Sequence, residues 1–99
     1  MAYTHAMKFD WDDDKNRSNF ERHGIWFEEA QTVWADPHSL EFYDPDHSDD
    51  EDRFIRVGYS SKERILLVVF CERSKGNTVR IISARRATRK EVRHHEEGI

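Results

Sequence analysis

The sequence predicts an α+β fold, in which two N-terminal helices and one C-terminal helix pack against an antiparallel β-sheet. Two helix-like segments precede a run of strand-like segments, and a capped helix follows that run. Runs of like elements are typical of α+β domains. A length of 99 residues allows one core. Three Trp, six Phe and three Tyr supply large apolar side chains for it. We therefore expect one sheet covered on one side by the helices.

The N-terminal part predicts a short strand and a capped helix. Residues 8–11 alternate polar and apolar side chains, which indicates a strand. Asp12 is a favourable N-cap residue, and the acidic residues after it favour a helix N-terminus. The helix is expected to continue to about His23, because Gly24 is a typical residue just past a helix C-terminus.

The next segments predict a second helix, a strand and a loop. The spacing of Phe27, Ala30, Val33 and Trp34 places apolar side chains on one helix face, and the pair Asp36-Pro37 ends this helix. Residues 39–43 form a short strand candidate. Residues 44–52, DPDHSDDED, are expected to form an acidic loop.

The remaining sequence predicts three strands and a final helix. Residues 53–59 alternate, with Ile55, Val57 and Tyr59 on one face, and residues 65–70 are apolar on both faces, as expected of a central strand. The segment Ser74-Lys75-Gly76-Asn77 predicts a hairpin turn before a strand over 78–84. Thr88 and Glu91 form a capping box that opens a helix over 89–97.

The chain is expected to form one domain over residues 7–99. Residues 1–6 are expected to be a disordered or vector-derived extension, since Met7 is itself a possible start. Cys71 is the single cysteine, which excludes an internal disulfide and fits a reducing compartment. No apolar run approaches the ~20 residues of a membrane span, and no signal peptide is visible. We therefore expect a cytoplasmic protein without membrane contact.

The net charge of -4 is the difference between an acidic and a basic half. Residues 1–52 carry fifteen Asp and Glu against four Lys and Arg, a balance of -11, and residues 53–99 carry twelve against five, a balance of +7. The basic half favours binding of a polyanion. Mutual attraction of the two halves within the fold is the alternative.

The candidate site residues are polar side chains that later parts of the chain contribute in three groups. They are His47, Glu51 and Arg53; Glu72, Arg73 and Arg80; and Ser83, Arg85, Arg86 and Arg89. RNA can be cleaved without a metal, because its 2′-hydroxyl is the nucleophile. The protein then moves protons, which suits His and Glu, and neutralises the phosphate, which suits Arg.

Strand alternation predicts where these side chains point. Arg56 and Arg80 alternate with apolar neighbours, so both are expected on an open face of the sheet. Ser83 shares the parity of Val79 and Ile81 and is expected to point inward. Arg85 and Arg86 precede a helix N-terminus, where guanidinium groups and helix amides together form a phosphate site.

Each candidate also has a simpler interpretation. His47 resembles a solvated loop residue, Glu51 and Arg53 can form an exposed ion pair, and the arginines from 85 to 93 can be a solvated helix face. The acidic loop fails the EF-hand pattern, because the sixth position is Asp49 and the twelfth is Ile55. No zinc spacing, P-loop, dinucleotide fingerprint or G-x-S-x-G is present, so we expect no metal and no cofactor.

Five motifs in order resemble the BrnT toxin family. They are Phe9-Asp10-Trp11-Asp12 with Lys15 and Asn19; His23-Gly24; Phe27-Glu28-Glu29-Ala30; His47-Ser48 with Glu51 and Arg53; and Arg80-Ile81-Ile82-Ser83-Ala84-Arg85 with Thr88 and Glu91. The resemblance extends over nearly all of residues 7–97. One departure lies at His94 and His95, where the family often has an aromatic residue.

The resemblance implies a fold similar to the RelE-type ribonucleases and a toxin of a bacterial type II toxin–antitoxin system. It implies a metal-independent endoribonuclease that arrests growth by cleaving RNA through its 2′-hydroxyl. It also implies a BrnA-like ribbon-helix-helix antitoxin as partner, with operator DNA bound only through that antitoxin. In this hypothesis Glu51 or His47 is the general base, and Arg53, Arg80 and Arg85 bind the scissile phosphate.

Six further residues are assigned to RNA binding, and they are Lys15, His23, Arg56, Arg73, Arg86 and Arg89. Glu91 is expected to cap the last helix instead of touching RNA. Two alternatives stay open. One is a module that binds nucleic acid without cutting it, which predicts salt-sensitive binding and intact RNA. The other is a protein whose basic face only receives an acidic antitoxin segment, which predicts neither RNA binding nor toxicity alone.

Overall fold

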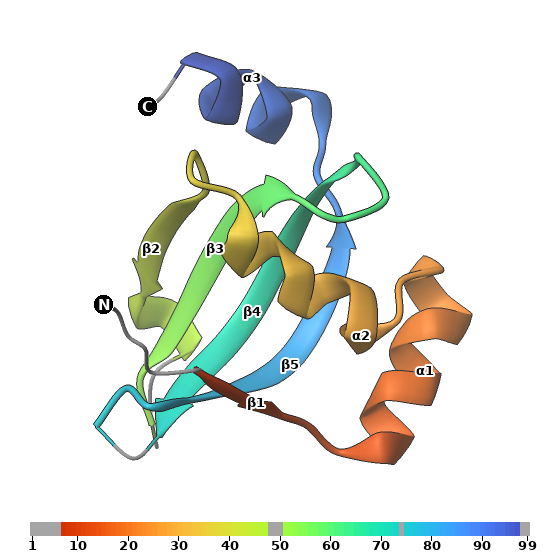
Figure 1. Cartoon of the computed structure of the whole chain (residues 1–99), viewed down its shortest axis with the longest axis vertical. Coiled ribbons are helices and arrows are strands. Elements are labelled where there is room, and N and C mark those ends of the chain that lie inside the picture. The colour runs from red at the N-terminus through yellow and green to blue at the C-terminus, as the bar shows by residue number, and fades with distance from the viewer. Residues whose placement is uncertain (1–6, 48–50, 74, 98–99) are drawn as a thin grey trace.

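The computed structural model describes residues 7–47, 51–73 and 75–97, and it has the predicted α+β architecture (Figure 1). Its elements are β1 (Lys8–Asp10), α1 (Asp13–His23), α2 (Phe27–Ala30), the 3-10 helix η1 (Gln31–Ala35), β2 (Leu40–Asp44), the 3-10 helix η2 (Pro45–His47), β3 (Arg53–Tyr59), β4 (Ile65–Arg73), β5 (Thr78–Arg86) and α3 (Arg89–Glu97). The sheet order is β1-β5-β4-β3-β2, antiparallel except for the parallel pair β1 and β5. Residues 1–6, expected to be a disordered or vector-derived extension, lie outside the described residues.

The main core lies between the sheet and the segment formed by α2 and η1. Its side chains on the helical side include Phe27, Ala30 and Val33, all fully buried, and those on the sheet include Phe70 and Ile81. Aromatic rings extend the core, because Trp34 packs edge to face on Phe70 at 4.8 Å between ring centroids. Burying one large apolar side chain contributes about 1.5–3 kcal/mol, so a few aromatic residues can stabilise so small a domain.

A smaller apolar cluster occupies the other face of the sheet. Val57, Ile65 and Leu67 form it, and Val92 of α3 packs against them. The expectation that all helices cover one side is therefore wrong for α3, which lies on the face opposite α2. The reason is that the central strand β4 is apolar on both faces, and such a strand needs cover on both sides.

Helix α1 is fixed to the edge of the sheet by Asn19. Its side-chain amide accepts from the Ala84 N–H at 3.1 Å and donates to the Ala84 carbonyl at 2.8 Å. These backbone groups lie on β5 beyond the three residues that pair with β1, so Asn19 satisfies an otherwise open strand edge. The predicted caps are present, with Asp12 accepting from the Lys15 amide and Gly24 left-handed at φ 71°.

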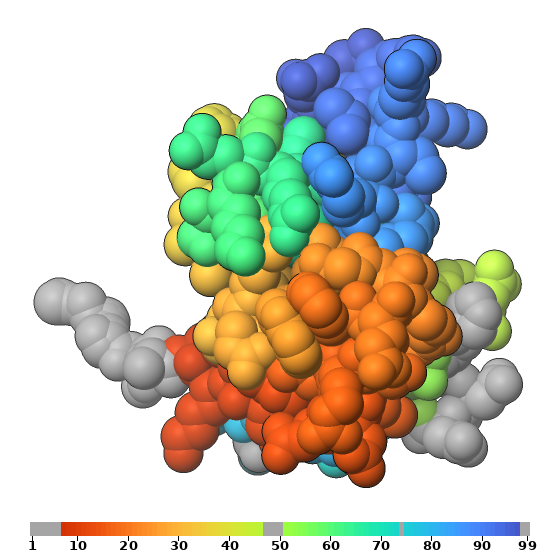
Figure 2. Space-filling model, turned by 90° about the vertical axis from the view of Figure 1, so that its right-hand side faces the viewer, coloured from red at the N-terminus to blue at the C-terminus, as the bar shows by residue number. Residues whose placement is uncertain are grey.

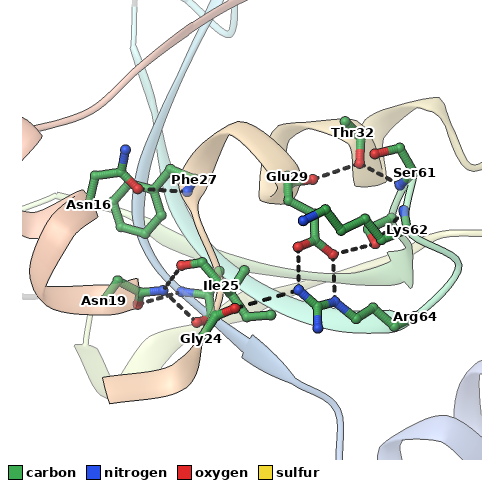
Figure 3. A network of polar contacts seen from close by, with 12 residues as sticks. Asn16, Asn19, Gly24, Ile25, Phe27, Glu29, Thr32, Ser61, Lys62 and Arg64 are labelled. Carbon is green, nitrogen blue, oxygen red and sulfur yellow. Dashed lines mark hydrogen bonds and ion pairs between the residues drawn. The ribbon is translucent and has the colours of Figure 1, made fainter. Parts of the chain in front are cut away.

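A buried ion pair connects the β3–β4 turn to α2 (Figure 3). Arg64 donates from Nη2 to Glu29 Oε1 at 2.6 Å and from Nε to Glu29 Oε2 at 2.8 Å, and the Ser60 hydroxyl donates to the same carboxylate at 2.6 Å. Figure 2 shows this side of the molecule, with α1 in orange below the green turn of residues 60–64. The contacts hold the helical layer against the sheet away from the candidate site.

In the part of the chain that the structure describes, no helix is both long enough and apolar enough to cross a membrane.

Candidate active site

One row of side chains crosses all five strands on the face opposite α2. Strand register places Asp10 of β1 beside Arg80 of β5, Arg80 beside Cys71 of β4, Cys71 beside Arg53 of β3, and Arg53 beside Asp44 of β2. Directly paired residues project to the same face of a sheet. We call these five residues the arginine row. It joins residues from both ends of the sequence in one surface.

A carboxylate lies beside this row. Glu51 precedes β3, and its Oε1 accepts from Nη2 of Arg73 at 2.9 Å. Burial raises the pKa of the Cys71 thiol, and the charge of Glu51 with a hydrogen bond to it raises that pKa further, against the opposing effect of Arg53 and Arg73. A raised pKa disfavours the reactive thiolate, so Cys71 is not a candidate nucleophile. Glu51 thus lies among the arginines, over the centre of the row.

Arg80 forms a partly exposed ion pair within the row. Its Nη1 donates to Asp10 Oδ1 at 3.2 Å, and its side chain is one-third exposed. An exposed ion pair of this kind contributes only about 0–1 kcal/mol, so a phosphate can displace the carboxylate. No local sequence pattern links Asp10 to Arg80, because Arg80 lies 70 positions farther along the chain.

Arg85 lies on the same face but at a distance from the row. It pairs with Leu67, four residues from Cys71 along β4, which corresponds to about 13 Å. Both of its terminal nitrogens donate to Glu91, each at 2.9 Å. The hydrogen bonds with Glu91 raise the pKa of Arg85, and those with Arg85 lower the pKa of Glu91. The expected capping role of Glu91 is also confirmed, since it accepts from the Thr88 amide at 2.7 Å.

A β-bulge places Arg85 on this face. β5 has one extra residue, Ile82, between its pairs with Phe70 and Val69, so the alternation of side chains reverses there. Ser83 therefore faces the same side as Val69, while Ala84 enters the core. The expectation that Ser83 points inward is wrong, because simple alternation does not hold across a bulge.

The prediction for Arg56 is also wrong, because its side chain lies on the helix-covered face. Its guanidinium donates to Ser39 Oγ at 2.7 Å and to Glu41 Oε1 at 2.6 Å, and it lies 4.9 Å from the centre of the Trp34 ring. Alternation gave the wrong face because Ile55 and Val57, its apolar neighbours, belong to the smaller cluster. Arg56 therefore has a structural role between β2, β3 and η1.

The other candidates lie outside the arginine row. Arg86 pairs with the core residue Leu66, so its side chain projects from the face opposite the arginine row. Arg89 is exposed and is the first residue of α3. Lys15 and His23 are exposed in the first and last turns of α1. His47 ends η2, three residues after Asp44, and its side chain lies outside the described part of the structure. Their roles in RNA binding or catalysis stay predictions.

The arrangement suits chemistry on a phosphate ester. The carboxylate of Glu51 is paired with Arg73 and contacts the Cys71 thiol, and Arg53 and Arg80 lie on either side of Cys71 in the sheet. Each of the three guanidinium groups can bind phosphate oxygens. Within residues 7–47, 51–73 and 75–97, no group of three His, Cys, Asp or Glu side chains is placed to hold a metal ion.

Comparison with known proteins identifies the family of this chain. Residues 11–91 match the family model described as the ribonuclease toxin BrnT of type II toxin–antitoxin systems. The chain also resembles the crystal structure of the Brucella abortus ribonuclease toxin BrnT, with a TM-score of 0.62 and 23% sequence identity over 85% of this chain and 100% of that one. At this identity the likeness concerns the fold. Among curated proteins, none matches this sequence.

Proposed function

Because the chain belongs to the BrnT family of ribonuclease toxins of type II toxin–antitoxin systems, we propose that it cleaves RNA at the arginine row by attack of the RNA's own 2′-hydroxyl, without a metal ion. Membership in this family implies an RNA substrate and an antitoxin partner. The observation that carries the proposal is the position of Glu51 beside Arg53 and Arg73, on the face that also presents Arg80.

In the proposed mechanism, Glu51 takes the proton of the 2′-hydroxyl. The 2′-oxygen then forms a bond to the adjacent phosphorus, and the bond from phosphorus to the 5′-oxygen of the next nucleotide breaks. The departing 5′-oxygen takes a proton from solvent water, and protonated Glu51 returns its proton to solvent, so the products are a 2′,3′-cyclic phosphate and a 5′-hydroxyl. Proton transfer by a positioned group contributes typically about 10²–10⁴ in rate. His47 is the alternative general base, because η2 directly follows the end of β2.

The arginines stabilise the negative charge that grows on the phosphorane. Arg53 and Arg80 flank Cys71 on either side, so their guanidinium groups can bind oxygens of one phosphate. RNA must first replace Asp10 on Arg80, which is inexpensive for a half-exposed pair. Arg85 contacts RNA farther along the strand, and Arg73, which is paired with Glu51, adds a phosphate contact beside the row. Lys15, His23, Arg86 and Arg89 lie outside the row, so contacts from them require RNA that extends around the domain. Burial of Arg56 against Trp34 removes it from this set.

Cleavage of cellular RNA explains how such a toxin arrests growth. We infer that it acts in the cytoplasm and that its antitoxin is of the BrnA type, a ribbon-helix-helix protein through which operator DNA is bound. These assignments rest on family membership, since the arginine row itself carries no information about the antitoxin's DNA-binding fold.

The test incubates the purified protein, freed of antitoxin, with end-labelled RNA in EDTA, with and without ribosomes. Fragments ending in a 2′,3′-cyclic phosphate are expected. Arg17→Ala on the exposed side of α1 is the matched control and should cut normally. RNA that is bound in a salt-sensitive way but recovered intact in both conditions would contradict the proposal and favour a binding module.

A further inference from the structure

An apolar groove lies next to the arginine row on the same face of the sheet. Its floor consists of side chains from three adjacent strands, and α3 forms one wall. The lining residues are Leu40, Phe42, Ile55, Val57, Leu67, Glu91, His94 and His95. The groove has a volume of about 160 Å³, and within the described residues its floor is left uncovered between β2 and α3.

The groove opens toward the edge of the sheet. Among the large apolar side chains that line the groove, Phe42 of β2 is the most exposed, at 45%. β2 is the last strand of the sheet, and in the described part of the chain no segment pairs with its outer side. Contiguous apolar surface beside an open edge is typical of a protein-binding site.

Basic side chains border this apolar surface on two sides. Arg53 lies two residues from Ile55 on β3, at the end of the groove nearest the arginine row. Arg85 of β5 lies beside Leu67, at the border of the groove on the side of β5. An occupant with an apolar face and acidic flanking residues complements this arrangement. Four of the lining side chains, Leu40, Ile55, Val57 and Leu67, are aliphatic, and together with Phe42 they form a continuous apolar surface that matches the apolar face of a protein segment.

We propose that the antitoxin binds in this groove through an amphipathic segment with apolar anchors on one face and acidic residues at its flank. Anchors enter between Phe42, Val57 and α3, while the acidic flank approaches Arg53 and Arg85. Such a segment neutralises the toxin because its flank covers the arginines proposed to bind the scissile phosphate. The inference thereby extends the proposed function to the way in which this site is blocked.

The experiment compares two serine variants on the same strand. Phe42→Ser removes the exposed aromatic anchor from the groove. Tyr43→Ser is the matched control, because Tyr43 is 52% exposed and projects to the other face, where it packs against Phe54. Calorimetric titration with the purified cognate antitoxin should show affinity reduced about tenfold or more for Phe42→Ser and unchanged for Tyr43→Ser. Both variants should melt within a few degrees of the native protein, since both side chains are exposed.

RNA cleavage separates this inference from the proposed function. Phe42→Ser should cut RNA at the native rate yet resist inhibition by antitoxin. Native antitoxin affinity in Phe42→Ser would overturn the inference, and so would loss of RNA cleavage with antitoxin affinity retained. His94→Asp tests the α3 wall independently. It places a negative charge near the acidic residues of the proposed antitoxin segment, so it should also weaken antitoxin binding. A native protein that cuts no RNA would refute the proposed function, while the titration would still test the groove.

Discussion

Arg80 and Arg85 project from the same face of β5 although an odd number of positions separates them. The relationship depends on Ile82, the extra residue of the bulge opposite Val69 and Phe70. Without this extra residue, the alternation of side chains along β5 would point Arg85 toward the face that α2 covers. Arg80 then joins the arginine row, whereas Arg85 is held by Glu91 about 13 Å farther along. We therefore expect the two arginines to have separable roles.

Replacing Arg80 should impair the chemical step. Arg80→Ala is expected to lower kcat by about 10²–10³, as for removal of one group that stabilises transition-state charge. Folding should be retained, because the side chain is one-third exposed and its partner Asp10 is half-exposed. Single-turnover cleavage of labelled RNA measures the rate, and growth after induction without antitoxin should recover. Asp10→Asn is the control and should retain activity.

Replacing Arg85 should instead weaken substrate binding. Arg85→Ala is expected to raise KM about tenfold with kcat little changed, since this residue contacts RNA away from the scissile phosphate. Steady-state kinetics should show this rise in KM on an RNA of roughly ten or more nucleotides, and should not show it on a dinucleotide. A fall in kcat as large as that of Arg80→Ala would place Arg85 at the reacting phosphate.

Replacing Glu51 should abolish cleavage but leave RNA bound. Glu51→Gln keeps the shape of the side chain and removes its capacity to take a proton, so kcat should fall about 10²–10⁴. Gel-shift titration should show affinity equal to or above that of the native protein, because one negative charge is lost near the phosphate. Glu72→Gln, at an exposed position of β4, is the matched control. Full activity of Glu51→Gln would leave His47 as the general base.

The buried pair of Glu29 and Arg64 should contribute strongly to stability. Arg64→Met leaves a buried carboxylate without its cation and should lower the free energy of unfolding by about 3 kcal/mol. The double variant Glu29→Gln with Arg64→Met should lose less, because the unpaired charge is removed. Chemical denaturation of the native protein, of Arg64→Met and Glu29→Gln, and of the double variant measures these differences. An additive loss in the double variant would show that the two side chains do not interact.

The same pair predicts a pH dependence of stability. The hydrogen bond from Arg64 lowers the pKa of Glu29 below its ordinary value of 4.5. Ionised Glu29 therefore stabilises the folded state above pH 4.5, and this stabilisation is lost as the pH falls from 4.5 through the folded pKa. Melting temperatures should decline more steeply with acidification in the native protein than in Glu29→Gln. Equal slopes would contradict the assignment.

Local sequence determined the elements of this protein, because their signals are local interactions. The Asp12 cap, Gly24 beyond the first helix and the capping box of Thr88 and Glu91 each concern residues a few positions apart, and the structure has all three. Alternation and apolar runs likewise predicted β3 and β4. The order of elements then implied the fold class, and the order of short motifs implied the family.

Tertiary structure decided which side chains share a face. Asp10 meets Arg80 only because β1 adds to the sheet beside β5, and no local pattern encodes that pairing. Arg56 and Ser83 lie on faces opposite to those predicted, the first because β3 is covered on both sides and the second because of the bulge. Successive side chains of a strand point to alternate faces of the sheet. This alternation predicts the environment of a side chain only when it is known which face is covered and whether a bulge interrupts the strand pairing. Both depend on contacts between distant parts of the chain, which the sequence pattern does not contain.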